Sequence, residues 1–220
     1  MASLTGARSG AGELLADRAY VELRDQILTL AIPPGAPINE ERLGRELQLG
    51  RTPLREAIKR LALENLIAVY PRRGTFVTEI NITDLADISD VRVQLEGHAA
   101  YRAAQRLTPA QRDELDALLR QLERPEGDLM GLDAEVHRFV YRCSANPYLR
   151  ETLERYLNLS LRIWYLVLGR LPHLLERVLE HHDLLLAIRD GDAGRARDVA
   201  ADHVANFELE IRSVLWPTTT

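Results

Sequence analysis

One strand–turn–strand pattern in an otherwise helical sequence is the feature that most constrains the fold. Residues 66–70 and 75–78 are mostly apolar or β-branched, and the Pro-Arg-Arg-Gly segment at residues 71–74 forms the turn between them. After Val77 no strand-like alternation is evident, and apolar residues recur at helical spacing instead. The sequence therefore predicts a mainly α protein that carries a small two-stranded hairpin.

Three helices are predicted before this hairpin, over residues 13–30, 40–47 and 52–64. Pro33-Pro34-Gly35 ends the first helix, and Asn39 suits the N-cap of the second. On the third helix, Arg51, Arg55 and Lys59 are spaced four apart, so they line one face that differs from the apolar face. The first part of the chain is thus a three-helix unit that ends in the hairpin.

Charge is distributed unevenly along the chain. The formal net charge is −5 over 220 residues, which taken alone argues against a nucleic-acid partner. Residues 1–80 carry 11 Lys and Arg against 10 Asp and Glu, whereas residues 81–220 carry 17 against 23. Between Arg42 and Arg73, eight basic residues stand against three acidic ones. This local basic patch indicates either an anion-binding module or a solvated charged face.

The second and third helices, joined by a short turn, are typical of a helix-turn-helix motif. The second helix of such a motif can lie in the DNA major groove, where Arg donates two hydrogen bonds to guanine. Thr52 and Lys59 suit phosphate or base contacts. The hairpin would then be a wing, because Arg72 and Arg73 suit a narrow minor groove and Gly74 allows close approach of the backbone.

This part of the sequence resembles the winged-helix domain of GntR-family transcription regulators. The most specific segment is Arg-Thr-Pro-Leu-Arg-Glu-Ala at residues 51–57. The family usually has Val-Ser before that Arg, where this chain has Leu49-Gly50, so one hydroxyl that could bind phosphate is missing. The resemblance implies operator contacts by Arg51, Thr52, Arg55 and the wing turn Arg72 to Gly74. Lys59 joins this set through its place on the basic stripe.

The rest of the chain is predicted to be an all-α antiparallel bundle of six or seven helices. Capping and breaking residues place the helices at about residues 83–106, 108–123, 128–144, 148–168, 173–189 and 193–215. The predicted domain organisation is a winged helix-turn-helix domain over residues 12–80 and a helical domain over residues 81–216.

Several polar residues of the helical part fall where a core is expected. Asp133 and His137 are spaced i, i+4, which places both on one helical face. His203 shares a stripe with apolar residues. His181 and His182 lie in a Leu-rich helix whose periodicity does not choose between them. One Asp and three His would offer ligands to a divalent metal, although a lone inward His is more often a hydrogen-bonded core residue.

The same spacings resemble the FCD ligand-binding domain of the FadR subfamily. The matching motifs are Arg92-x-x-x-Glu96, Asp133-x-x-x-His137, Glu180-His181 and His203. Many members of this subfamily hold zinc, nickel or another divalent ion with one Asp and three His. The resemblance therefore implies a divalent metal cofactor, with zinc or nickel expected, whose ligands are Asp133, His137, His181 and His203. His182 is then a bystander.

A small carboxylate effector could complete the coordination of such a metal. Arg92 could bind that carboxylate through two hydrogen bonds, or it could instead form an ion pair with Glu96. Arg162 is the second candidate effector-binding residue, because it lies with Trp164 and Tyr165 on a helix that could line the same cavity. A Trp at helical spacing is, however, more often a core residue.

Taken together, these features predict a ligand-responsive transcription regulator. It would bind a palindromic operator in double-stranded DNA as a homodimer, and a carboxylic acid would shift the population of DNA-competent dimers. Two alternatives remain open, a metal-dependent helical-bundle enzyme and a regulator whose metal is purely structural. We expect no enzymatic activity, because no nucleophile motif, phosphate-binding Gly-rich loop or spaced general base is evident.

Location and redox chemistry follow from what the sequence lacks. No apolar run approaches the ~18 residues needed to span a membrane, and residues 1–12 have no signal-peptide core. Cys143 is the one cysteine, so an intrachain disulfide and a Cys-based zinc cluster are excluded. We expect a soluble, cytoplasmic protein without a membrane partner, in which any metal relies on histidine and carboxylate.

Overall fold

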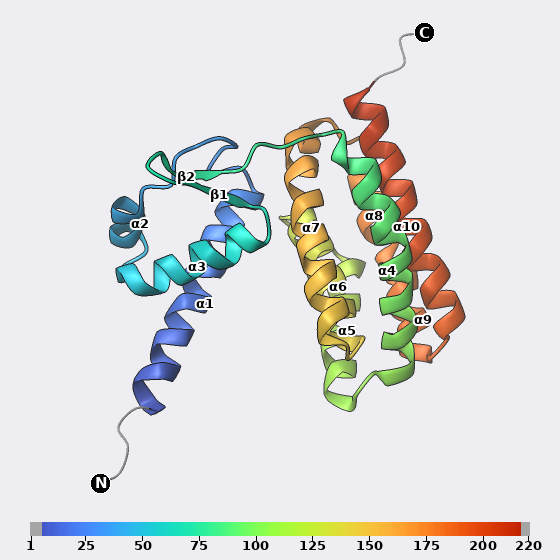
Figure 1. The fold of residues 1–220 in the computed structure, drawn as a ribbon. Helices are drawn as coiled ribbons and strands as arrows, with labels where there is room; N and C mark the ends of the chain where they lie inside the picture. The colour runs from blue at the N-terminus through green and yellow to red at the C-terminus, as the bar shows by residue number, and fades with distance from the viewer. Residues whose placement is uncertain (1–5, 217–220) are drawn as a thin grey trace. The chain divides into compact units, whose positions relative to one another are not determined.

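The computed structural model describes residues 6–216 of the chain, with the burial of side chains from residue 14 onward. It is mainly α with a two-stranded wing after a helix-turn-helix, as predicted (Figure 1). The chain divides into two compact units. One unit extends to Asn81 and includes Leu161–Leu166, and the other comprises Ile82–Ser160 and the chain from Val167 onward.

The first unit contains three helices and a hairpin: α1 (Gly6–Leu28), α2 (Glu40–Glu46), α3 (Arg51–Leu63), β1 (Ile67–Tyr70) and β2 (Gly74–Val77). The three predicted helices and the hairpin are confirmed, although α1 begins several residues before the predicted start. Asn39 is the N-cap of α2, because its side chain accepts a hydrogen bond of 2.8 Å from the Arg42 amide. The core of the unit contains Leu23, Ile27, Leu43, Leu54, Leu61 and Leu66.

The wing is an antiparallel pair in which Tyr70 stands opposite Gly74. Residues 71–73 form its turn, and Gly74 has a φ of +108°, a left-handed conformation that favours glycine. The segment between α1 and α2 pairs with β2 on its other side. The Ile38 amide donates to the Thr75 carbonyl at 2.8 Å, and the Val77 amide donates to the Ala36 carbonyl at 2.9 Å. The sequence did not predict this pairing, since Pro37 interrupts the segment and cannot donate a hydrogen bond.

The second unit is helical: α4 (Asp84–Arg106), α5 (Pro109–Glu123), α6 (Leu129–Cys143), most of α7 (Pro147–Val167), the 3₁₀ turn η1 (Leu168–Arg170), α8 (Leu174–Leu179), α9 (His181–Asp190) and α10 (Ala193–Leu215). Side chains of Asp128, Asn146 and Asp192 cap α6, α7 and α10, and Thr108 and Gln111 form a capping box on α5. In the part of the chain that the structure describes, no helix is long and apolar enough to cross a membrane.

One predicted helix is divided in the structure. The sequence predicted a continuous helix over residues 173–189, whereas α8 and α9 meet at Glu180. Glu180 keeps helical backbone angles (φ −57°, ψ −27°), so the apolar periodicity continues through the junction and does not mark it. The division matters because Glu180 lies next to His181 and directs its own side chain to another predicted metal ligand.

Helix α4 packs closely along α10, with small residues at the contact. A Cβ atom at Gly97 would lie 3.1 Å from the Arg197 carbonyl oxygen and 3.6 Å from the Ala201 Cβ. Gly191, in the left-handed conformation (φ +76°), ends α9, and α10 begins two residues later. This tight turn and the close α4–α10 contact position His203 in the interior of the bundle.

Candidate metal centre and nucleic-acid interface

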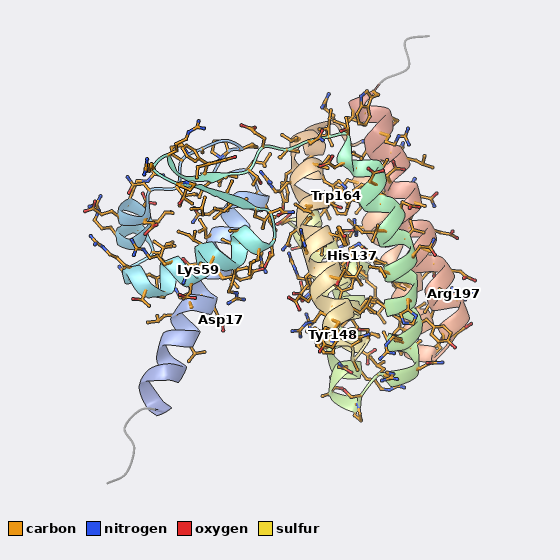
Figure 2. The ribbon with its side chains drawn as sticks, viewed as in Figure 1. Asp17, Lys59, His137, Tyr148, Trp164 and Arg197 are labelled. Atoms are coloured by element: carbon orange, nitrogen blue, oxygen red, sulfur yellow. The ribbon has the colours of Figure 1, made fainter. Side chains whose placement is uncertain are left out.

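Four buried side chains converge inside the helical unit. Asp133 and His137 lie one turn apart on α6, His181 is the first residue of α9, and His203 lies in the middle of α10. Each of the four is at most 3% exposed, and one potential ligand atom from each lies within 4.8 Å of the others. His137 is labelled in Figure 2. The structure brings His181 into this group, while the neighbouring His182 is partly exposed.

The Asp133 carboxylate lies among the three imidazoles. Its Oδ1 atom is 2.8 Å from His181 Nε2 and 3.7 Å from His203 Nε2, and its Oδ2 atom is 3.7 Å from His137 Nε2. The rings of His181 and His203 have centroids 4.2 Å apart. We refer to Asp133, His137, His181 and His203 as the Asp/His cluster.

Several atoms of the Asp/His cluster are buried without a hydrogen-bond partner. Asp133 Oδ2, His137 Nε2 and His203 Nε2 are in this position, as is Nδ1 of His181. An unsatisfied buried polar group costs about 1–3 kcal/mol, so a cluster of them requires an explanation. A divalent cation would satisfy nitrogen and oxygen atoms that lie this close together, and one Asp with three His suits zinc or nickel. The donor set therefore fits a metal ion.

Two carboxylates outside the Asp/His cluster hold two of its imidazoles. His137 Nδ1 lies 2.6 Å from Glu96 Oε2, and His203 Nδ1 lies 3.0 Å from Glu180 Oε2. An ionised carboxylate can only accept hydrogen bonds, so the proton of each neutral imidazole belongs on Nδ1. The Nε2 lone pair of each ring is then free to point into the cluster. This pairing of a carboxylate with a histidine is the usual support for metal-binding imidazoles.

Arg92 and Glu96 form a buried ion pair on α4. Arg92 is 1% exposed, and its Nε donates to Glu96 Oε1 at 2.8 Å, where the Tyr141 hydroxyl also donates at 2.8 Å. Burial alone would raise the pKa of the Glu96 carboxyl, but Arg92 and His137 hold it far below its usual value. The ion pair was the alternative to effector binding by Arg92. The effector role of Arg92 stays a prediction.

The members of the Asp/His cluster differ in their charge at neutral pH. Burial raises the pKa of Asp133, but the neighbouring imidazoles lower it well below its usual value, so the carboxylate is ionised. Burial lowers the pKa of His181 to about 4, and the charge of His203 acts in the same direction. Burial would also lower the pKa of His203, but the nearby Asp133 carboxylate and the hydrogen bond to Glu180 raise it to about 9, so a metal ion must displace a proton from this imidazole.

Arg162 binds the protein main chain in the unit that contains the winged helix. Its Nη1 donates to the Thr78 hydroxyl at 2.7 Å, and its Nη2 donates to the Thr78 carbonyl. Burial lowers the pKa of Arg162 to about 10. These contacts give the guanidinium partners other than an effector, so the effector role of Arg162 also stays a prediction. The nearby Trp164 is buried (Figure 2).

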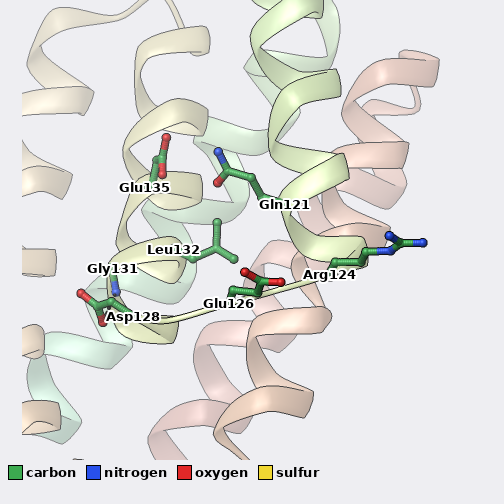
Figure 3. Close-up of a pocket in the computed structure, with 7 residues that line it drawn as sticks. All are labelled: Gln121, Arg124, Glu126, Asp128, Gly131, Leu132 and Glu135. Atoms are coloured by element: carbon green, nitrogen blue, oxygen red, sulfur yellow. Dashed lines mark hydrogen bonds between the residues drawn. The ribbon is translucent and has the colours of Figure 1, made fainter.

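A separate cavity of about 510 Å³ lies between the end of α5 and the start of α6 (Figure 3). It is lined by Gln121, Arg124, Glu126, Asp128, Gly131, Leu132 and Glu135. None of these residues belongs to the Asp/His cluster. Three carboxylates against one guanidinium would repel a carboxylate ligand, so this cavity does not suit the effector that the sequence predicted.

The predicted DNA-contacting residues form an exposed surface on α3 and the wing. All seven are exposed: Arg51, Thr52, Arg55, Lys59, Arg72, Arg73 and Gly74. Arg55 Nε donates to Glu40 at 2.9 Å, and Lys59, labelled in Figure 2, donates to Glu56 at 2.8 Å. The Arg73 guanidinium lies 5.6 Å from the Tyr70 ring centroid. Among the described residues, neither Arg51 nor Arg72 forms an ion pair, so both can meet an anion.

Two carboxylates of these sites had no predicted role, although Glu180 stands in the Glu180-His181 motif. Glu40 pairs with Arg55, and Glu180 pairs with His203, across 15 and 23 residues of sequence. Only their positions in the sequence pointed to them, because Glu40 follows a helix N-cap and Glu180 precedes a predicted metal ligand. Both partnerships depend on how helices cross, which periodicity does not specify.

A winged helix with an exposed basic helix, joined in one chain to a helical unit with a buried candidate metal centre, defines a class of protein: a DNA-binding regulator with its own sensor domain. Two family models match the chain in this order. Residues 15–77 match the bacterial regulatory proteins of the gntR family, and residues 87–206 match the FCD domain. The chain belongs to the GntR family of bacterial regulatory proteins and carries an FCD domain, as the sequence resemblance implied.

Individual relatives agree with this assignment. An HTH-type transcriptional regulator in an unstable DNA locus of Streptomyces ambofaciens is 31% identical over 189 residues, which cover 84% of this chain and 80% of that protein. The HTH-type transcriptional repressor RspR of Escherichia coli is 27% identical over 202 residues, which cover 89% of this chain and 88% of RspR. The solved structure of Escherichia coli McbR/YncC superposes with a TM-score of 0.78 at 26% identity, covering 90% of this chain and 97% of McbR. The chain is a transcription regulator and not an enzyme.

Proposed function

We propose that this regulator, as a member of the FadR subfamily, senses a small carboxylic acid at a divalent metal and responds by changing its affinity for operator DNA. The ligands of the metal are Asp133, His137, His181 and His203, with zinc or nickel as the ion. The observation that carries this proposal is the set of buried, partnerless Asp and imidazole atoms in the Asp/His cluster. Cytoplasmic location is part of the same proposal, because the operator lies there.

DNA binding is assigned to α3 and the wing. Arg51, Arg55 and Lys59 line the exposed side of α3, so the helix can enter a major groove with its N-terminal residues at the base edges. Arg72, Arg73 and Gly74 at the wing turn suit the neighbouring minor groove or phosphates. We propose that the protein acts as a homodimer, because a two-fold protein matches a palindrome whose half-sites lie about one helical turn (~34 Å) apart.

The charge inside the bundle supports an anionic effector. When bound, the ion supplies two positive charges and a coordination position for an anionic oxygen. Arg92 contributes one further positive charge, and Glu96 and Asp133 contribute two negative ones. With neutral imidazoles the interior then carries one net positive charge, and a buried uncompensated charge is costly. A carboxylate would neutralise it, whereas without the ion a protonated His203 leaves the interior with no net charge to attract one.

Effector binding and DNA binding are then two linked equilibria. An effector that binds one dimer arrangement better than the other shifts the population by that difference in affinity. Reciprocity requires that operator DNA changes the apparent affinity for the effector by the same factor. A regulator whose metal is purely structural would show no such linkage.

The proposal is tested on the purified full-length protein. Selection of bound sites from a random DNA pool should recover a two-fold symmetric site, and Arg51→Ala and Arg55→Ala should each weaken binding to it by at least about tenfold while the circular dichroism spectrum stays unchanged. Elemental analysis should find one divalent ion per chain, lost in Asp133→Ala. A panel of small carboxylic acids should then raise the melting temperature of the metal-bound protein only. Operator affinity unaffected by both Arg substitutions would overturn the DNA assignment, and no shift with any acid would favour a structural metal.

A further inference from the structure

We propose that Glu40 is a positioning residue for base recognition: it holds the Arg55 guanidinium so that its two terminal nitrogens face the DNA, and it thereby sets specificity at the base pair that Arg55 reads. This inference rests on the proposed function, in which α3 is the recognition helix. It adds a residue that carries the wrong charge for a DNA contact and lies outside the basic stripe.

The Glu40–Arg55 pair joins the two helices of the helix-turn-helix. Glu40 is the first residue of α2, and Arg55 lies in the second turn of α3. The Arg55 Nε atom donates to Glu40 Oε2 at 2.9 Å. The other ion pairs of α2 lie within that helix, namely Arg42 with Glu46 and Arg45 with Glu41. Within the described part of the chain, the Glu40–Arg55 pair is the ion pair that connects α2 to α3.

The geometry of this hydrogen bond decides which edge of the guanidinium is available. Guanidinium has five N–H donors in a fixed plane, and Glu40 occupies the one on Nε. The two terminal nitrogens remain to donate the pair of hydrogen bonds that reads O6 and N7 of guanine. The Arg55 side chain is 63% exposed, so without Glu40 it would sample many rotamers and lose more entropy on binding. Glu40 itself is only 32% exposed, which limits its own freedom.

Charge alone predicts the opposite effect of Glu40. A carboxylate near the phosphate backbone repels it, so removal of a nearby negative charge should strengthen binding to any DNA. For the operator, the positioning role predicts that removal of Glu40 weakens binding, whereas charge repulsion predicts that it strengthens binding. For unrelated DNA, neither predicts weaker binding. That difference makes the proposal testable with one substitution and a matched control.

Glu41 is the matched control. It is the next residue of the chain, shares the first turn of α2 with Glu40, and carries the same charge. Its partner Arg45 lies on α2 at 3.5 Å, and the Glu41 side chain is 73% exposed. Glu40→Ala and Glu41→Ala therefore change the net charge and the N-terminal turn of α2 alike, but only Glu40→Ala releases Arg55.

The experiment measures dissociation constants of the full-length protein at one salt concentration. The DNAs are the operator selected by the wild-type protein and a scrambled duplex of equal length. We expect Glu40→Ala to weaken operator binding about tenfold, the lower part of the range for losing a well-oriented Arg–guanine pair, and to leave scrambled binding unchanged or tighter. Glu41→Ala should leave both unchanged or slightly tighter. Glu40→Gln, which keeps an acceptor of the same size, should lie between wild type and Glu40→Ala.

A double-mutant cycle separates a role through Arg55 from a general role. In an Arg55→Ala background, Glu40→Ala should no longer weaken operator binding. An equal loss in that background, an equal loss on scrambled DNA, or tighter operator binding by Glu40→Ala would each overturn the proposal. Melting temperatures confirm that the variants are folded, and Glu40→Gln carries the test if Glu40→Ala is not. A wild-type protein that selects no site would instead overturn the proposed function, and this inference with it.

Discussion

Nδ1 of His203 lies 3.0 Å from Oε2 of Glu180, the residue at which α8 and α9 meet. Arg177 fixes Glu180 in turn. Its Nη1 donates to Glu180 Oε1, and its Nε donates to Glu210 on α10 at 2.9 Å. An imidazole in the interior of the bundle is therefore oriented by a carboxylate whose side chain is 34% exposed. Because Glu180 reaches solvent, it can be altered without leaving a charge enclosed in the protein.

We expect Glu180→Gln to weaken metal binding by about tenfold, at the lower end of the 10–100-fold typical for residues that support a metal ligand. A neutral amide is a weaker acceptor for the His203 Nδ1–H than a carboxylate, so the Nε2 lone pair becomes less basic and less well oriented. Competition with a chromophoric chelator measures the affinity directly.

Glu176→Gln is the control for this substitution. Glu176 lies one turn earlier on α8, and its side chain is 66% exposed near His173, away from the Asp/His cluster. Its removal should leave metal affinity unchanged. Equal affinities of wild type and Glu180→Gln would show that Glu180 does not support His203.

Removal of the metal should lower the melting temperature. A ligand present at about 100 times its dissociation constant stabilises the native state by about 2.7 kcal/mol, which for a chain of this size corresponds to roughly 5–10 °C. Scanning calorimetry before and after dialysis against a chelator measures the difference, and readdition of zinc or nickel should restore it. Asp133→Ala should melt at one temperature in both conditions. A wild type that melts identically with and without metal contradicts the proposed ligand set.

Much of the fold could be predicted because its signals are local. Asn39, Thr108, Asp128 and Asn146 each cap the helix that follows them, so short-range hydrogen bonding marks these helix starts in the sequence. The α8–α9 junction was missed because Glu180 keeps helical angles and the apolar pattern passes through it. The pairing of Ala36 and Ile38 with β2 was missed because it joins residues 37 and 41 positions apart.

The ligands of the Asp/His cluster could be predicted only in part from the periodicity of apolar residues. Spacing placed Asp133 and His137 on one face, but it could not choose between His181 and His182, because apolar residues surround both. That choice depends on the rotation of α9 about its own axis, which its packing against α10 and α4 determines. The pairings of Glu96 with His137 and Glu180 with His203 depend on the same packing.

The Cys143 thiol should make unfolding more favourable at alkaline pH. Burial raises its pKa to about 12, with Glu114 adding to the rise and Arg142 opposing it, whereas in an unfolded chain a thiol titrates near 8.5. As the pH rises, the thiol of the unfolded state loses its proton before that of the folded state. The contribution of the buried, protonated thiol to the free energy of unfolding is therefore complete below about pH 8.5 and is lost as the pH rises towards 12. The stability difference between wild type and Cys143→Ala should fall by up to about 1.4 kcal/mol per pH unit in this window. Urea unfolding at pH 8, 9 and 10 under reducing conditions measures it, and a constant difference would argue against a protonated buried thiol.

Replacement of Glu96 by Ala should destabilise the protein strongly. The substitution leaves Arg92 buried without its carboxylate partner, and breaking a buried ion pair typically costs about 3–5 kcal/mol. Glu114→Ala, which breaks the exposed pair with Arg142, should cost less than about 1 kcal/mol. Urea denaturation of both variants measures the two losses. Similar free energies of unfolding would show that the buried ion pair contributes no more to stability than the exposed one.

The two glycines Gly97 and Gly194 should respond oppositely to larger side chains. In α10, a Cβ at Gly194 would have only the Asp192 carboxylate near it, at 3.7 Å, so Gly194→Ala should raise the free energy of unfolding by up to about 1 kcal/mol through helix propensity. At Gly97 the added atoms would meet the α10 backbone at 3.1 Å, so Gly97→Val should lower it by about 1–3 kcal/mol through overpacking. Because α10 carries His203, Gly97→Val should also weaken metal binding, measured by the same chelator competition. A Gly97→Val protein that unfolds less readily than Gly194→Ala would refute the close α4–α10 contact.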